Sequence, residues 1–174
     1  NDFPEKNKDM IYFRIGEIKL KNKNFEDAVN AFNKVTFGSS YNNQALFNKG
    51  LAYLEMNKVD PAIAVFQQIV EHRAKSPVTD TNKVAAQMAL ARSYYQKQEW
   101  DSAIEAYAQI PRDHFMWHDA LFEQSWAMLR GARFRSALSN FQSLHSAYYD
   151  DFYIPESLLL RSIVYLYICK YDEM

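Results

Sequence analysis

The sequence contains a single cysteine, Cys169, and only four glycines among its 174 residues. One thiol forms neither an internal disulfide framework nor a thiolate metal site. So few glycines leave no P-loop and no Gly-x-Gly-x-x-Gly dinucleotide turn, and the Gly-x-Ser-x-Gly elbow is also missing. Cys169 lies in a densely apolar segment, where we expect a small packed residue and no nucleophile. The sequence therefore predicts a protein that is not an enzyme and has no catalytic residues.

An excess of charge of either sign is missing too. The 20 Lys and Arg residues nearly balance the 21 Asp and Glu residues, which gives a formal net charge of −1. Nucleic-acid binders and proteins of anionic membrane surfaces show a basic excess or stripe, so we expect neither kind of partner. No apolar run reaches the length of about 18 residues that marks a membrane-spanning helix. Composition leaves the cellular compartment open.

The histidines offer one possible metal pair. His114 and His118 are four residues apart and would share one helix face. The segment lacks the Glu of a His-Glu-x-x-His motif and has no third ligand at a suitable spacing. We therefore expect no metal site and no cofactor, and assign no role to His72 or His145.

A repeated pattern is the dominant signal. Four segments place a large apolar residue three positions before an alanine and an aromatic residue four positions after it. The alanines are Ala28, Ala62, Ala103 and Ala137, separated by 34, 41 and 34 residues. Such a period is typical of a helix–turn–helix unit that stacks on its neighbours.

Small residues recur upstream of the four alanines, and once more in a fifth, incomplete unit, where a first helix would approach a second one closely. They are Gly16, Gly50, Ala91, Ser125 and Ser162. The helix ends are also predicted: Asp60 and Pro61 as an N-cap and first helical position, Gly38 and Gly131 as left-handed C-terminal caps, and Pro111 as a stop.

The pattern resembles the tetratricopeptide repeat family over nearly the whole chain. The resemblance implies an all-α fold, a right-handed superhelical solenoid of antiparallel helix hairpins. It comprises four full repeats, near residues 9–40, 43–75, 84–115 and 118–150, and a truncated fifth at 155–174, in a single domain of residues 1–174. The family's terminal proline is replaced by Ser40, Ala74, Phe115 and Tyr149.

The family binds partners in a concave groove lined by the first helix of each repeat. The resemblance therefore implies a protein–protein interaction scaffold whose partner is a protein, a peptide or a helix. The groove positions are Phe13, Glu17, Lys21, Phe47, Asn48, Leu51, Met88, Arg92, Tyr95, Phe122, Trp126 and Ile163. Each could instead pack on the next hairpin. Because Phe13, Phe47 and Met88 occupy slots that need Lys or Asn, we expect no carboxylate clamp for acidic peptide tails.

By resemblance, a bacterial cell-envelope assembly is one setting, and the rival function is a regulatory or sensor module of a larger protein. Two irregular segments could be contact sites or simple spacers: the insertion near Lys75–Thr81 and the aromatic stretch Tyr148–Tyr153. Residues 157–171 are apolar on almost every side and need cover. This predicts a fragment of a longer array, or self-association through this helix.

Overall fold

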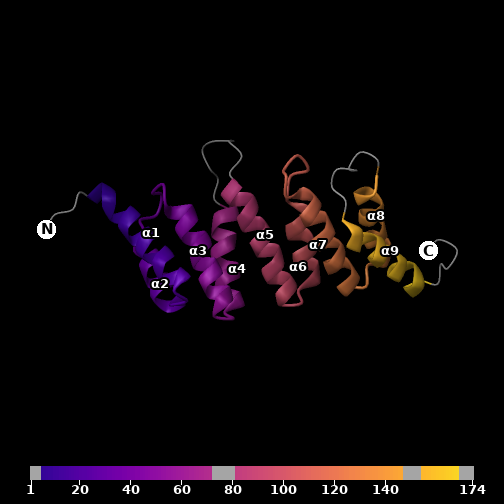
Figure 1. The fold of residues 1–174 in the computed structure, drawn as a ribbon, viewed down its shortest axis with the longest axis horizontal. Coiled ribbons are helices and arrows are strands. Elements are labelled where there is room, and N and C mark those ends of the chain that lie inside the picture. The colour runs from indigo at the N-terminus through magenta and orange to yellow at the C-terminus, as the bar shows by residue number, and fades with distance from the viewer. Residues whose placement is uncertain (1–4, 72–80, 147–153, 169–174) are drawn as a thin grey trace. The chain divides into compact units, whose positions relative to one another are not determined.

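The computed structural model describes residues 5–71, 81–146 and 154–168 (Figure 1). These residues form nine α-helices and no strand, which confirms the all-α prediction. The helices are α1 (Glu5–Lys21), α2 (Phe25–Phe32), α3 (Asn42–Glu55), α4 (Val59–Glu71), α5 (Thr81–Gln96), α6 (Trp100–Ala108), α7 (Trp117–Arg130), α8 (Phe134–Leu144) and α9 (Pro155–Tyr167).

The chain divides into two compact units, residues 1–97 with α1–α5 and residues 98–174 with α6–α9. In unit 1 each helix packs on the next, and α3 also contacts α1 and α5. This places α1, α3 and α5 in one layer and α2 and α4 in the other. In unit 2, α6 packs on α7, α7 on α8 and α8 on α9. That the two units join in one continuous solenoid stays a prediction.

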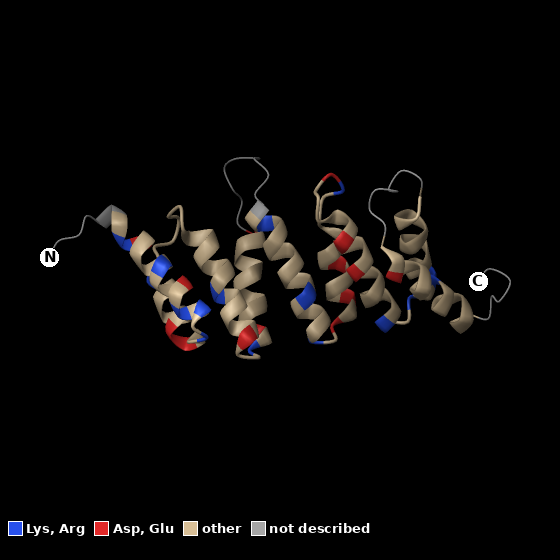
Figure 2. Ribbon diagram, in the orientation of Figure 1, with Lys and Arg blue, Asp and Glu red and all other residues tan. Residues whose placement is uncertain are grey.

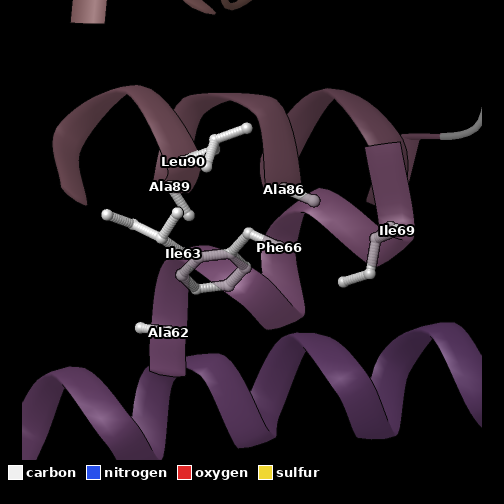
Figure 3. Close-up of a cluster of buried hydrophobic side chains, with 7 residues drawn as sticks. All are labelled: Ala62, Ile63, Phe66, Ile69, Ala86, Ala89 and Leu90. Carbon is white, nitrogen blue, oxygen red and sulfur yellow. The ribbon is translucent and has the colours of Figure 1, made fainter. Parts of the chain in front are cut away.

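Close approach of paired helices organises unit 1, as the small-residue pattern predicts. A Cβ atom added to Gly16 would overlap the ring of Phe32, and one added to Gly50 would overlap the ring of Phe66. Phe66 is fully buried, beside Ala62 and Ile69 of its own helix and Ala86 of α5 (Figure 3). Burying a phenylalanine side chain contributes about 1.5–3 kcal/mol. The glycines are therefore present because the aromatic rings of the second helices occupy the space of a side chain.

The same arrangement holds in unit 2 with other small residues. Ala137 and Ser125 are both completely buried, and the Ser125 hydroxyl donates to the carbonyl oxygen of Leu121 at 2.7 Å. That bond satisfies the buried hydroxyl inside its own helix. The core then continues through Phe141 of α8 to Val164 of α9. All four repeat alanines have no exposed surface, which confirms their predicted place in the contacts between helices.

The hairpin turns contain a left-handed residue at the same point of each repeat, and none of these is glycine. They are Lys23, Asn57, Gln98 and Ala132, with φ between 57° and 63°. At Ala132 the amide donates to the carbonyl of Leu129, and the Arg133 amide donates to that of Met128, as in a Schellman cap. Gly38 is left-handed, with φ 83°, but α2 ends at Phe32 with Asn33 as its cap, so the prediction that Gly38 caps this helix was wrong. The prediction for Gly131 was wrong by one residue, since its φ is −84°.

Two other predicted helix ends can be compared. Helix α6 ends at Ala108 and Pro111 follows it, as predicted. Helix α4 begins at Val59, so Asp60 and Pro61 lie inside its first turn and are not its cap. A proline is tolerated there because the first amides of a helix have no partner within the helix.

Candidate functional site

Two of the predicted groove residues are part of the hydrophobic core. Phe13 is 4% exposed, with its ring centroid 6.2 Å from that of Phe32 and 5.4 Å from that of Tyr41. Met88 is 1% exposed. Both side chains face neighbouring helices because their large apolar surface is removed from water there. The prediction that Phe13 and Met88 line the groove was therefore wrong, because neither side chain offers surface to a partner.

Three further residues of the set pack against a core with part of the side chain. Phe47 lies 5.8 Å from Phe66, ring centroid to ring centroid, and Leu51 borders the same cluster. Phe122 borders the cluster of α8 and α9. All three are half-buried. They support the helix faces more than they project from them.

The polar members of the set lie in unit 1. Glu17 accepts a hydrogen bond from Arg14 at 2.7 Å within α1. Arg92 is exposed, and Asn48 and Tyr95 are half-buried. Lys21 is exposed at the end of α1. In unit 1 this face is therefore mixed, with charged groups beside half-buried apolar ones.

Trp126 and Ile163 are the members that expose a large apolar side chain, 38% and 37% respectively. They are 37 residues apart, in α7 and α9. The same offset relates Ala127 to Val164, which are both completely buried. Trp126 and Ile163 therefore occupy equivalent positions, one residue before a buried anchor, in successive first helices. We call these two residues the partner face.

Charge surrounds the partner face unevenly. Asp119 and Glu156, again 37 residues apart, are exposed near the starts of α7 and α9. Figure 2 shows further acidic positions on α6 and α7. At the other end of α7 the guanidinium of Arg130 lies 5.3 Å from the centre of the Trp100 ring. The apolar pair thus has carboxylates towards one end of its helices and a cation at the end of α7.

Other exposed apolar side chains lie outside the predicted set. On α9 they are Leu158, Leu159, Leu166 and Tyr167, with Tyr167 stacked on Phe134 at 5.7 Å. At the position equivalent to Leu159, the earlier repeats have residues that are buried or half-buried between helices, namely Phe13, Phe47, Met88 and Phe122. The exposure of Leu159 thus marks a surface suited to helix packing. Phe37 and Phe115, in the loops before α3 and α7, are 77% and 70% exposed.

Two cavities in the part of the chain that is described, of about 460 and 390 Å³, are open depressions beside hairpin turns, lined by residues such as Trp100 and Phe134. Within the described residues, no three potential metal ligands lie close enough together to hold an ion. His114 accepts a hydrogen bond from the Met116 amide at 3.2 Å, and His118 is buried against Trp117.

Some predicted features lie outside the described residues: Cys169, His72, most of the insertion near Lys75–Thr81, and the aromatic stretch Tyr148–Tyr153. Within the described helices, none has both the length and the apolar character that crossing a bilayer requires.

The helices and their faces define a class: a helical-hairpin repeat protein with a surface suited to binding. Two family models match the chain, and both are described as tetratricopeptide repeat. The first matches residues 44–76 and 85–114, and the second matches residues 11–36. Together these matches cover just over half of the sequence. The chain belongs to the tetratricopeptide repeat family.

Solved structures with the same fold include a crystal structure of MamA protein, with a TM-score of 0.76 and 20% identity. That match covers 96% of this chain and 86% of the MamA chain. A kinesin light chain protein from Podosopora anserina with nearly identical TPR-like repeats gives a TM-score of 0.69 at 15% identity, covering 98% of this chain and 92% of the other. At these identities the likeness concerns the fold alone. The comparison with curated proteins gives no match.

Proposed function

We propose that the chain is a protein–protein interaction scaffold that binds a helix or an extended peptide through the partner face, Trp126 and Ile163. What supports the proposal is the exposure of two large apolar side chains at equivalent positions of successive first helices. Each side chain stands beside a buried residue of the same helix, so its backbone is held by the core. Tryptophan on a rigid element is typical of the residues that dominate binding energy.

The surroundings of the partner face favour an amphipathic partner. Apolar anchors spaced by one or two helical turns would cover Trp126 and Ile163. Asp119 and Glu156 towards one end, and Arg130 at the other, would form a polar rim around this centre. A rim of this kind selects orientation and partner more than it adds affinity.

Unit 1 would contribute a second, more polar contact region. Leu51 and Arg92 occupy the positions equivalent to Trp126, at repeat spacings of 41 and 34 residues. An arginine and a half-buried leucine suit a partner that presents an aromatic ring beside apolar groups, because a guanidinium stacks on aromatic faces. Affinity would nevertheless depend mainly on the partner face, because desolvated aromatic contacts carry most of the energy in such interfaces.

A peptide selection tests the proposal. Peptides are selected from a random library on the immobilised chain, and their dissociation constants are measured for the wild type, Trp126→Ala and Ile163→Ala. We expect the dissociation constant of the Trp126→Ala variant to be at least about tenfold higher than that of the wild type, as is usual for a central aromatic contact. The dissociation constant of the Ile163→Ala variant should rise by a smaller factor.

Phe115→Ala is the matched control, since it removes an exposed aromatic ring from a loop of the same unit. Its affinities should equal those of the wild type, and circular dichroism should show all three variants folded. An acidic peptide with a free carboxylate end should fail to bind. The proposal is wrong if the selected peptides bind both partner-face variants as tightly as the wild type, or if the wild type selects none.

A further inference from the structure

Helix α9 is apolar on two sides. One side contains Leu160 and Val164, which are buried in the core that α9 shares with α8. The other side consists of four residues at helical spacing, which we call the outer face of α9: Leu158, Leu159, Ser162 and Leu166. Its three leucines are between 42% and 64% exposed. The outer face is therefore an apolar surface in contact with water.

Helix α7 has an equivalent face, and there a helix covers it. The residues 37 positions earlier in the sequence are Leu121, Phe122, Ser125 and Leu129. The three large ones are half-buried and pack against the cluster that includes Phe141 of α8. The small one, Ser125, has no exposed surface. The outer face of α9 thus repeats, almost residue for residue, the surface of α7 on which α8 packs.

Ser162 occupies the small-residue position of the repeat. The equivalent residues of the four earlier repeats are all buried, whereas Ser162 is half-buried. In unit 1 an aromatic ring of the second helix fills the space beside this position, because a Cβ atom added to Gly16 or Gly50 would overlap such a ring. A small residue at this point of α9 therefore leaves room for an aromatic side chain.

The second helices of the chain show which kind of helix fits such a face. Each of α2, α4, α6 and α8 has an alanine with no exposed surface, and four residues later an aromatic residue that is at most 4% exposed. These side chains are already buried in their own hairpins. A second copy of the chain could therefore provide such a helix only by unfolding one of its hairpins.

We propose that the outer face of α9 binds an amphipathic helix of another protein. The helix has a large apolar residue three positions before an alanine and an aromatic residue four positions after it. The alanine allows close approach to α9, and the aromatic ring lies against Ser162. Trp126 is not part of this surface, so the proposal goes beyond the proposed function and does not rest on it.

A peptide with the sequence of residues 133–146 tests the proposal, because it contains α8 and hence the required pattern. The peptide is cross-linked on its polar side, since so short a helix is marginal in water. Its binding to the nitrogen-15-labelled chain is followed by NMR. We expect amide shift changes centred on α9.

Ser162→Leu separates a shaped site from a merely apolar one. The leucine adds apolar surface but fills the space of the ring, so the dissociation constant should rise at least about tenfold. Ser162→Ala, which keeps the position small, should bind the peptide as the wild type does. A peptide with Phe141→Ala should also bind at least about tenfold more weakly, and this change cannot affect the folding of the chain. Trp126→Ala should leave the dissociation constant of the peptide unchanged.

Four results would overturn the proposal. The peptide does not bind, or Ser162→Leu binds it as tightly as the wild type does. The shift changes fall on α7, which would mean that the peptide replaces α8, or Trp126→Ala weakens binding as much as Ser162→Leu. Sedimentation of the chain alone adds a fifth: a dimer that Leu159→Ser dissociates would show that a second copy covers the outer face.

Discussion

Ala132 has the left-handed backbone that ends α7, with φ 58°, while its neighbour Gly131 has φ −84°. The one glycine of this turn thus lies one residue before the left-handed position, where a glycine would be most stabilising. A left-handed conformation costs an L-residue with a Cβ atom about 1–2 kcal/mol.

Ala132→Gly should therefore raise the free energy of unfolding, by about 0.5–1 kcal/mol once the greater freedom of glycine in the unfolded chain is included. Urea unfolding measures the change. Gly131→Ala serves as the comparison, because its new Cβ would lie 3.3 Å from that of Trp100 and 3.4 Å from the Ala127 oxygen, and it should bring no gain. A loss of stability in Ala132→Gly would contradict the cap assignment.

Gly50→Ala should destabilise unit 1, because the new Cβ would overlap the Phe66 ring. Overpacking of this kind costs about 1–3 kcal/mol. The double variant Gly50→Ala, Phe66→Leu should lose less than the sum of the two single variants, since the smaller side chain leaves room for the methyl group. Additive losses in denaturant unfolding would show that these two residues do not compete for the same space.

Buried amide groups connect three helices of unit 2. Gln124 donates to the Ile104 carbonyl at 2.9 Å and accepts from Asn140 at 2.9 Å. Gln124→Leu should cost about 1–3 kcal/mol, because two hydrogen bonds are lost and the Asn140 amide loses a partner. Adding Asn140→Leu should cost little more. A double variant with fully additive losses would argue against the network.

We expect the stability of the fold to depend on pH through His118. Burial lowers its pKa, and Asp119 partly opposes that effect. Since the folded pKa lies below the unfolded value, the stabilisation is complete above the ordinary pKa of about 6.5 and is lost as the pH falls from there through the folded value. His118→Gln should therefore lose less stability than the wild type in urea unfolding between about pH 7 and about pH 5. Asp119→Asn should lower the His118 pKa further in an NMR titration.

Ion pairs join two of the hairpin turns to the preceding second helix. Lys97 lies 2.8 Å from Asp60 and Arg133 lies 2.6 Å from Asp101, all with substantial solvent exposure. Exposed pairs contribute about 0–1 kcal/mol, so Lys97→Ala and Arg133→Ala should each change the unfolding free energy by less than that. A larger loss of unfolding free energy, or a loss that persists in high salt, would show that these ion pairs contribute more to stability than exposed pairs usually do.

The repeat and its close contacts are determined by the sequence itself. Gly16, Gly50 and the repeat alanines recur with the helical period, and a small residue opposite an aromatic one has few other uses in a helical hairpin. Helix faces and inter-helix contacts could be predicted because they depend on residue size and spacing along one hairpin.

Tertiary structure decided which large side chains reach solvent. Phe13 and Trp126 were equal members of the predicted groove, but Phe13 is buried and Trp126 is exposed. Phe13 lies at the repeat position of Met88 and Phe122, four residues before the position of Trp126. The difference between Phe13 and Trp126 therefore depends on which face of each first helix turns towards its neighbours, and residue type does not specify that. The His145–Ser157 contact likewise needs the α8–α9 turn to bring two helix ends together. Local periodicity is determined by the order of residues along the chain. Exposure of side chains and hydrogen bonding between helices arise only when the helices have packed.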